Sequence, residues 1–163
     1  MSIANLESRI PEYARDIRLN LTTLAAEESL TPQQKWGTFY ATSLATGQAE
    51  LIRSIGAEAV QHMTPQAMDA ARSAASIMAM NNVYYKFTGM MNDDYKTMPA
   101  KLRMSVIGNP GVEKIDFELW SLAVSAINGC QFCVVSHEAK LASGGLSREQ
   151  IQASIRIAAV INA

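Results

Sequence analysis

The stretch TPQQKWGTFYATSLA, residues 31–45, carries the signals of a helix start and indicates the class of fold. Thr31 can cap a helix, Pro32 suits the first helical position, and Gln34 can bond back to the cap residue. This arrangement is a capping box, because the two side chains satisfy backbone N–H groups that have no partner inside the helix. The stretch therefore predicts a helix that begins next to Thr31.

Two further stretches repeat these signals. TPQAMDAARSAASIMAM begins with a Thr-Pro pair at Thr64, and SREQIQASIRIAAVINA begins with Ser147 and has Gln150 three residues later. Alternating strand patterns bounded by turn dipeptides are largely absent, and the clear breaks are GNPG at 108–111 and SGG at 143–145. We therefore predict an all-α fold.

The helix starts at Thr64 and Ser147 lie 83 residues apart, which indicates an internal repeat. Each is followed by an apolar residue four positions later and by Ala at the sixth position. Similar spacings relate two further pairs, Trp36 with Trp120 and Gly47 with Gly129. Capped, Ala-rich helices can also resemble one another by chance. If the repeat is real, the fold contains two similar helical halves, and the tryptophans are core anchors.

Length and composition bound the class of protein. A chain of 163 residues, 48% hydrophobic and 18% charged, is predicted to fold as one domain over residues 1–163. The formal net charge of −1 argues against a nucleic-acid partner, which would need a clustered basic surface. Charges interrupt the N-terminal segment, and no run approaches the roughly 18 apolar residues that a membrane helix requires. We therefore expect a cytoplasmic protein with no membrane partner.

Both cysteines lie in the segment NGCQFCVVSHE, Asn128 to Glu138, with one of the two histidines. Asn128 is predicted to cap a helix that runs to about Ala142, which places Cys130 and Cys133 in its first turn. Free N–H groups and the positive end of the helix dipole stabilise thiolates there. Residues three apart on a helix have Cα atoms about 5 Å apart, a distance that a disulfide tolerates.

His137 follows Cys133 by four residues, so it should lie one turn along on the same face of the helix. A neutral imidazole there can take the thiol proton, and an imidazolium would hold the thiolate. Such a base needs a third group to orient it. Glu118, in the stretch FELWSLAVSA, can supply this group if the two helices pack antiparallel. Glu138 should point away as a solvated charge.

Three interpretations of the cysteine pair stay open on these grounds: a redox pair, a structural zinc site, and inert buried residues. A zinc site would use both thiolates and His137, but it wants a fourth ligand, and His62 has no ligand-like spacing. If both cysteines were inert, the position of His137 four residues after Cys133 would have no explanation. A thioredoxin-type CxxC would lie between strands, which this sequence lacks, so the scaffold differs.

The run MAMNNVYYKFTGMMNDDYKTM, residues 78–98, is rich in Met and Tyr. It predicts core, a docking groove or a subunit interface, and the composition favours core and interface over the groove. Within it, Asn81 and Asn82 predict polar groups that are satisfied in a buried turn, without indicating a reaction.

The cysteine segment and the preceding FELWSLAVSAI resemble the AhpD alkyl hydroperoxidases of the carboxymuconolactone-decarboxylase-like superfamily. The resemblance covers nearly the whole chain and includes IPEYARDIRLNL, WGTFYAT, IGAEA, MNNVYYKF and RMSVIGNPGV. It implies an all-helical fold with two related halves that assembles as a homotrimer. It also implies an antioxidant enzyme, a lipoyl-dependent peroxidase that acts on small organic hydroperoxides.

The resemblance further implies partners and residue roles. Electrons would come from dihydrolipoamide on a lipoyl-bearing dehydrogenase component, with no bound cofactor or metal, and would pass to the peroxiredoxin AhpC or to a hydroperoxide. Cys133 would be the peroxidatic thiol that becomes a sulfenic acid, and Cys130 would donate a proton and then form the Cys130–Cys133 disulfide. Glu118 and His137 would form the proton relay. Phe132 stands where some relatives place a histidine, so this chain lacks that imidazole.

Two other functions remain open on this scaffold. The first is a disulfide-exchange adaptor that has no peroxidase activity and acts on other proteins. The second is a carboxymuconolactone-decarboxylase-like lactone enzyme, which would have no use for a redox cysteine pair.

Overall fold

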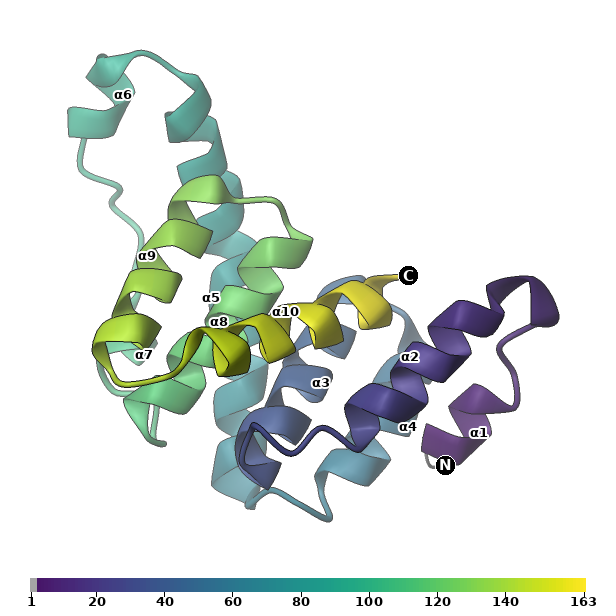
Figure 1. Ribbon diagram of the computed structural model, residues 1–163. Coiled ribbons are helices and arrows are strands. Elements are labelled where there is room, and N and C mark those ends of the chain that lie inside the picture. Colours follow the sequence, from purple (N-terminus) through teal and green to yellow (C-terminus); the bar gives the residue numbers. More distant parts are fainter. Residues whose placement is uncertain (1–2) are drawn as a thin grey trace.

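The computed structural model describes residues 3–163, and within them the chain consists of helices joined by turns, without a strand (Figure 1). The elements are α1 (Ile3–Glu7), the 3-10 helix η1 (Glu12–Ala14), α2 (Arg15–Ala25), α3 (Pro32–Thr46), α4 (Ala49–Ala59), α5 (Pro65–Met90), α6 (Asp93–Thr97), α7 (Ser105–Gly108), α8 (Lys114–Ile127), α9 (Gln131–Ser143) and α10 (Arg148–Asn162). The predicted all-α fold is confirmed. Within the same range, no helix has both the length and the apolar character needed to cross a membrane.

The predicted helix starts are also confirmed. Thr31 Oγ1 accepts the N–H of Gln34 at 3.2 Å, and the Gln34 side chain accepts the Thr31 N–H, which completes the capping box of α3. Ser147 and Gln150 make the same pair of bonds at the start of α10. Thr64 caps α5 through its hydroxyl. Each start depends on residues within three positions of one another, so local sequence suffices to set it.

Two runs of three helices repeat along the chain. The second run, α8, α9 and α10, begins at residues 114, 131 and 148, which lie 82, 82 and 83 positions after the starts of α3, α4 and α5 at 32, 49 and 65. The glycines after the first helix of each run also correspond, since Gly47 has φ 72° and Gly129 has φ 66°. Both therefore turn the chain in the left-handed conformation that glycine tolerates best. The two similar helical halves that the sequence predicts are present.

The first helices of the two halves, α3 and α8, pack against each other and against α5 and α10 in the centre of the molecule. Trp36 and Trp120 are both buried, as core anchors should be. Trp120 Nε1 donates to the carbonyl oxygen of Gln34 at 3.2 Å. Gly37 makes this approach possible, because a Cβ at that position would lie 2.2 Å from Trp120 Cε2. The absence of one methyl group therefore sets the distance between the two central helices.

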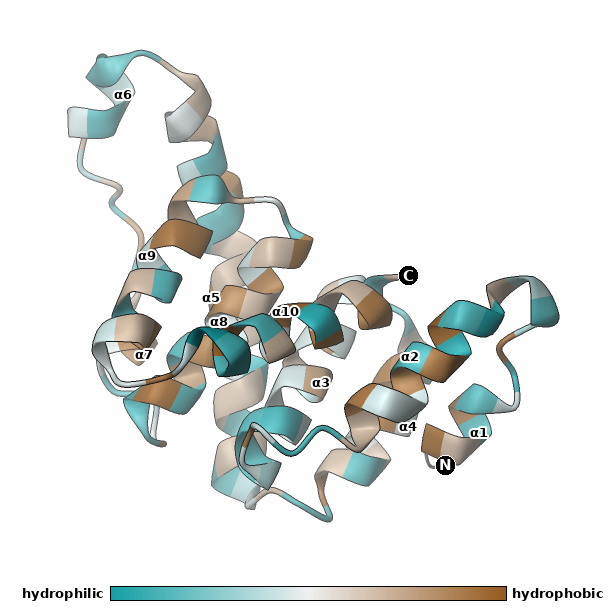
Figure 2. Ribbon diagram, viewed as in Figure 1, coloured by the Kyte–Doolittle hydropathy of each residue, from teal (hydrophilic) through white to brown (hydrophobic). Residues whose placement is uncertain are grey.

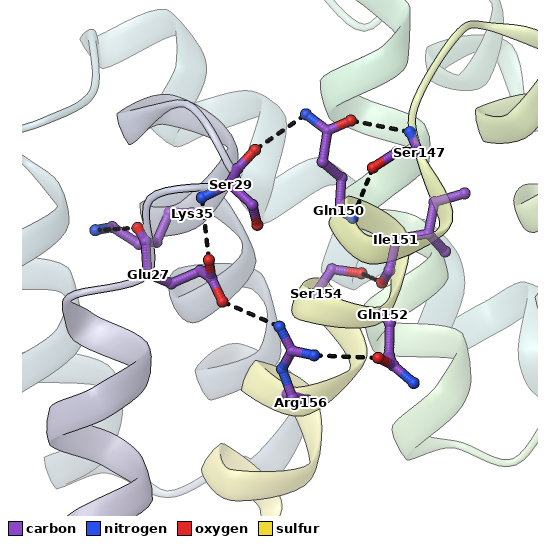
Figure 3. A network of polar contacts seen from close by, with 9 residues as sticks. All are labelled: Glu27, Ser29, Lys35, Ser147, Gln150, Ile151, Gln152, Ser154 and Arg156. Carbon is purple, nitrogen blue, oxygen red and sulfur yellow. Dashed lines mark hydrogen bonds and ion pairs between the residues drawn. The ribbon is translucent and has the colours of Figure 1, made fainter.

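Polar contacts fasten the C-terminal helix α10 to the segment that leads into α3 (Figure 3). Gln150 Nε2 donates to the carbonyl oxygen of Ser29 at 3.0 Å. The guanidinium of Arg156 lies 3.0 Å from the carboxylate of Glu27. The Ser29 N–H also donates to Glu27, and this bond, together with the guanidinium of Arg156, holds the pKa of the Glu27 carboxyl below its usual value. The end of the second half is thus tied to the beginning of the first.

The last part of α5 and the short α6 project away from the other helices (Figure 1), and α6 is mostly hydrophilic in Figure 2. The Met- and Tyr-rich run is core only at its start, where Met78 is buried. Beyond it, large apolar side chains are exposed: Val83, Phe87, Met90, Met91, Tyr95 and Met98. The interpretation of this projection as a subunit interface stays a prediction.

The expectation of a buried turn at Asn81 and Asn82 is wrong. Both residues are buried, but they lie inside the continuous helix α5. Asn82 Nδ2 donates to Ser125 Oγ at 2.9 Å, and its Oδ1 accepts from Asn128 Nδ2 at 2.9 Å. These bonds to neighbouring segments offset the low helix propensity of asparagine, so the helix continues through it.

Candidate active site

The two cysteines lie at the turn from α8 into α9. Asn128 ends α8, Gly129 turns the chain, and Cys130 is the cap residue of α9. The prediction that Asn128 caps the new helix is wrong, because the left-handed turn at Gly129 delays the helix by two residues. Cys130 Sγ instead accepts the N–H of Cys133 at 3.4 Å, which is the bond that a capping oxygen usually makes.

Cys130 and Cys133 form a disulfide, and their Cα atoms are 5.3 Å apart. The two residues expose only 0% and 4% of their surfaces. When the bond is reduced, the sulfur of Cys130 stays at the positive end of α9, next to a backbone N–H that can donate to a thiolate. The position therefore suits a cysteine pair that alternates between dithiol and disulfide.

A hydrogen-bonded triad lies next to the disulfide. His137 on α9 and Glu118 on α8 are both buried, and His137 Nδ1 lies 2.5 Å from Glu118 Oε2. Lys140 Nζ donates to the other carboxylate oxygen at 3.0 Å. Burial raises the pKa of Glu118, but the hydrogen bonds and charges of His137 and Lys140 outweigh it and hold that pKa below its usual value. Glu118 is therefore a carboxylate that fixes the orientation of the imidazole.

The other ring nitrogen of the imidazole is directed away from Glu118. His137 Nε2 lies 3.2 Å from the sulfur of Met78, a buried residue of α5. His137 and Cys133 also line one cavity of about 140 Å³. Its wall includes Met78, Asn81, Tyr85 and Phe132. A proton can thus be exchanged at Nε2 inside the cavity while Glu118 holds Nδ1.

Phe132 stands at the rim of this cavity. Its side chain is 59% exposed, and its ring stacks on that of Tyr85 with centroids 5.0 Å apart. A larger pocket of about 580 Å³ begins on the same two residues and extends to Met90, Lys86 and Lys96. The small cavity and the larger pocket therefore share the part of their walls that Phe132 and Tyr85 form.

The structure brings together all four residues that the sequence singled out, Glu118, Cys130, Cys133 and His137. Their catalytic roles remain predictions. Glu138 is exposed, as expected. His62 lies just after α4 and stacks on Trp36 with ring centroids 4.8 Å apart. Within residues 3–163, no three His, Cys, Asp or Glu side chains gather in a way that could hold a metal ion.

Sequence reasoning missed two residues of the site. Lys140 follows His137 by three positions and so shares its helix face, a signal that could have identified it. Met78 could not have been found in this way, because it lies 59 residues from His137 and reaches it only through the packing of α5.

Known proteins are similar to this sequence over 99–100% of its length. The model of the carboxymuconolactone decarboxylase family matches residues 93–163. The alkyl hydroperoxide reductase AhpD of Gluconacetobacter diazotrophicus is 55% identical over 163 residues, which is 100% of this chain and 90% of that protein. The proteins of the same name from Hyphomonas neptunium and Brucella anthropi are 57% and 55% identical, over 100% and 99% of this chain and 91% and 93% of their own. With such similarity along its whole length, the chain belongs to the AhpD family of alkyl hydroperoxide reductases.

Proposed function

We propose that this protein is a thiol-dependent reductase of small organic hydroperoxides. The observation that carries the proposal is the Cys130–Cys133 disulfide at the start of α9, beside a buried histidine that a carboxylate orients. The names of the relatives, alkyl hydroperoxide reductase AhpD, support the same substrate class.

The first step oxidises Cys133. Its thiol gives a proton to His137, and the thiolate attacks the terminal oxygen of the hydroperoxide. The O–O bond breaks, Cys133 becomes a sulfenic acid, and the departing alkoxide takes a proton from Cys130 to leave as the alcohol.

The second step forms the disulfide. The thiolate of Cys130 attacks the sulfur of the sulfenic acid, and hydroxide leaves with the proton held by His137, as water. Two thiols and one hydroperoxide thus give one disulfide, one alcohol and one water. The lowered pKa of Glu118 supports this relay, because an ionised Glu118 stabilises the imidazolium in both steps.

Re-reduction needs a dithiol that reaches buried sulfurs. We infer that the donor is the dihydrolipoamide of a lipoyl carrier protein, since a slender apolar arm fits the pocket of about 580 Å³ beside Phe132. Lys86 on the wall of that pocket suits an acidic carrier, whereas Lys96 there already pairs with Asp93. The family resemblance also suggests AhpC as a protein substrate.

By the same resemblance we propose a homotrimer in the cytoplasm. Sedimentation equilibrium then gives three times the chain mass of 17.7 kDa. Any other multiple of the chain mass would contradict the trimer but would leave the proposed reaction unaffected.

Intact mass measured under native conditions tests the reaction. One equivalent of tert-butyl hydroperoxide should lower the mass of the reduced chain by about 2 units, and dihydrolipoamide should restore it. Cys130→Ser should stop at the sulfenic acid and gain about 16 units, while Cys133→Ser should not change. If the reduced parent chain keeps both thiols, the peroxidase proposal fails.

The same variants separate the other functions. An adaptor would show no peroxide turnover but would still pass electrons from dihydrolipoamide to the disulfide of a partner protein. A lactone enzyme would keep its full activity in Cys133→Ser, and that outcome would exclude the redox function.

A further inference from the structure

Asn81 is a buried polar residue that the mechanism above does not use. It exposes only 4% of its surface, and its side-chain oxygen is buried without a hydrogen-bond partner. Its neighbour Asn82 is equally buried but bonds to both Ser125 and Asn128. Buried polar atoms are nearly always paired in folded proteins, so an unpaired oxygen in a residue that lines a cavity indicates a ligand that completes it.

The cavity that Asn81 lines is the one shared by Cys133 and His137. Two other polar groups on its wall are engaged elsewhere: Lys140 bonds to Glu118, and the hydroxyl of Tyr85 lies 3.9 Å from the sulfur of Met104. The volume of about 140 Å³ equals that of four to five water molecules at about 30 Å³ each. It therefore suits the peroxide end of a small substrate, with Asn81 as a buried acceptor.

Resting on the proposed hydroperoxide reductase function, we propose that Asn81 binds and orients the substrate. Its side-chain oxygen accepts the O–H of the hydroperoxide, which directs the terminal oxygen at Cys133 and leaves the alkoxy oxygen free to receive a proton. The thiolate attacks the terminal oxygen and the O–O bond breaks. The hydrogen on the terminal oxygen stays in place and becomes the O–H of the sulfenic acid, so Asn81 keeps its hydrogen bond throughout the step.

On this proposal Asn81 acts only in the half of the catalytic cycle in which the hydroperoxide reacts. Hydroperoxide carries an O–H that Asn81 can accept. A sulfur electrophile without a hydrogen-bond donor, such as methyl methanethiosulfonate, makes no use of that acceptor. The two reagents therefore separate recognition of the peroxide from the general reactivity of the Cys133 thiolate.

The experiment compares Asn81→Leu with the parent side chain in the Cys130→Ser background, where Cys133 is the one remaining thiol. Stopped reactions and intact mass give the rate of sulfenic acid formation with tert-butyl hydroperoxide and of methylthiolation with methyl methanethiosulfonate. We expect the first rate to fall about tenfold, the effect of one neutral hydrogen bond, while the second changes less than twofold. Because leucine removes an unpaired buried oxygen, the melting temperature should hold or rise.

Three results would overturn the inference in distinguishable ways. Unchanged peroxide rates would show that Asn81 does not contact the substrate. An equal fall with both reagents would assign it to the thiolate or the fold instead. If the Cys130→Ser chain with Asn81 failed to react with hydroperoxide, and the chain with both cysteines also kept its thiols, while methyl methanethiosulfonate still modified Cys133, the proposed function and this inference would be overturned together.

Discussion

Replacing Gly37 with alanine tests how closely the two central helices must approach. The new Cβ would lie 2.2 Å from Cε2 and 2.4 Å from Nε1 of Trp120, although Cβ contacts under 3.0 Å essentially never occur in proteins. Trp120 is completely buried, so its indole has no free space to enter. Either α3 and α8 separate, or the indole moves and loses its bond to the Gln34 carbonyl.

Opposing effects decide how much Gly37→Ala lowers the free energy of unfolding. Alanine is favoured over glycine within a helix by about 1 kcal/mol. Overpacking the core costs about 1–3 kcal/mol, and leaving the indole N–H unpaired costs about 1–3 kcal/mol more. The expected net loss in the free energy of unfolding is therefore about 3 kcal/mol. For a chain of this length, that loss lowers the melting temperature by roughly 6–12 °C.

Thermal and urea unfolding, followed by far-ultraviolet circular dichroism, measure this loss in the free energy of unfolding. Gly89→Ala is the matched control, because Gly89 also lies in a helix but a Cβ there would meet nothing within 4 Å. We expect the control to be as stable as the parent chain or up to about 1 kcal/mol more stable. If Gly37→Ala were as stable as this control, helix propensity would outweigh the contact, and the argument that Gly37 sets the distance between α3 and α8 would be refuted.

Three further predictions concern a cap, a titrating group and a turn. Thr31→Ala should lower the free energy of unfolding by about 1 kcal/mol in urea titration, since it removes the hydroxyl that accepts the Gln34 N–H, and Thr31→Ser should restore most of it. Because the folded-state pKa of Glu118 is lowered, its charge stabilises the fold fully above the ordinary value of 4.5, and this contribution is lost as the pH falls through the lowered pKa. Glu118→Gln should therefore flatten the acid side of a plot of melting temperature against pH, and an unchanged acid slope would contradict the assignment. Gly129→Ala should cost about 1–2 kcal/mol in thermal unfolding through its φ of 66° alone, because no atom lies within 4 Å of the added Cβ, and Gly129→Asn should cost less.

Much of the fold could be predicted from short-range signals. The caps at Thr31, Thr64 and Ser147 each act over three residues, so the sequence contains all that they need. The contact of His137 with Glu118 was also within reach, because helix periodicity places the histidine on the face that α8 covers. The start of α9 was not, since three residues, 128–130, separate it from the end of α8 and only the backbone shows that the last of them, Cys130, caps the helix.

The wall of the cavity depends on tertiary packing and could not be predicted. Met78 and Asn81 come from α5, far from the cysteines in sequence, and nothing near them signals that they face His137. The buried asparagines also misled the prediction. A pair of asparagines normally indicates a turn, and only the partners that Asn82 finds on other segments make a helix the better solution.

The burial of both sulfurs affects the rate at which a thiol can reduce the disulfide. Thiol–disulfide exchange requires in-line attack on a sulfur atom, so its rate depends on access as well as on reduction potential. We expect a bulky tripeptide thiol such as glutathione to reach these sulfurs poorly, because the two cysteines expose only 0% and 4% of their surfaces, and the slender dithiol proposed above to reach them better. On that proposal the shape of the reductant, ahead of its driving force, would decide which donor reduces the disulfide.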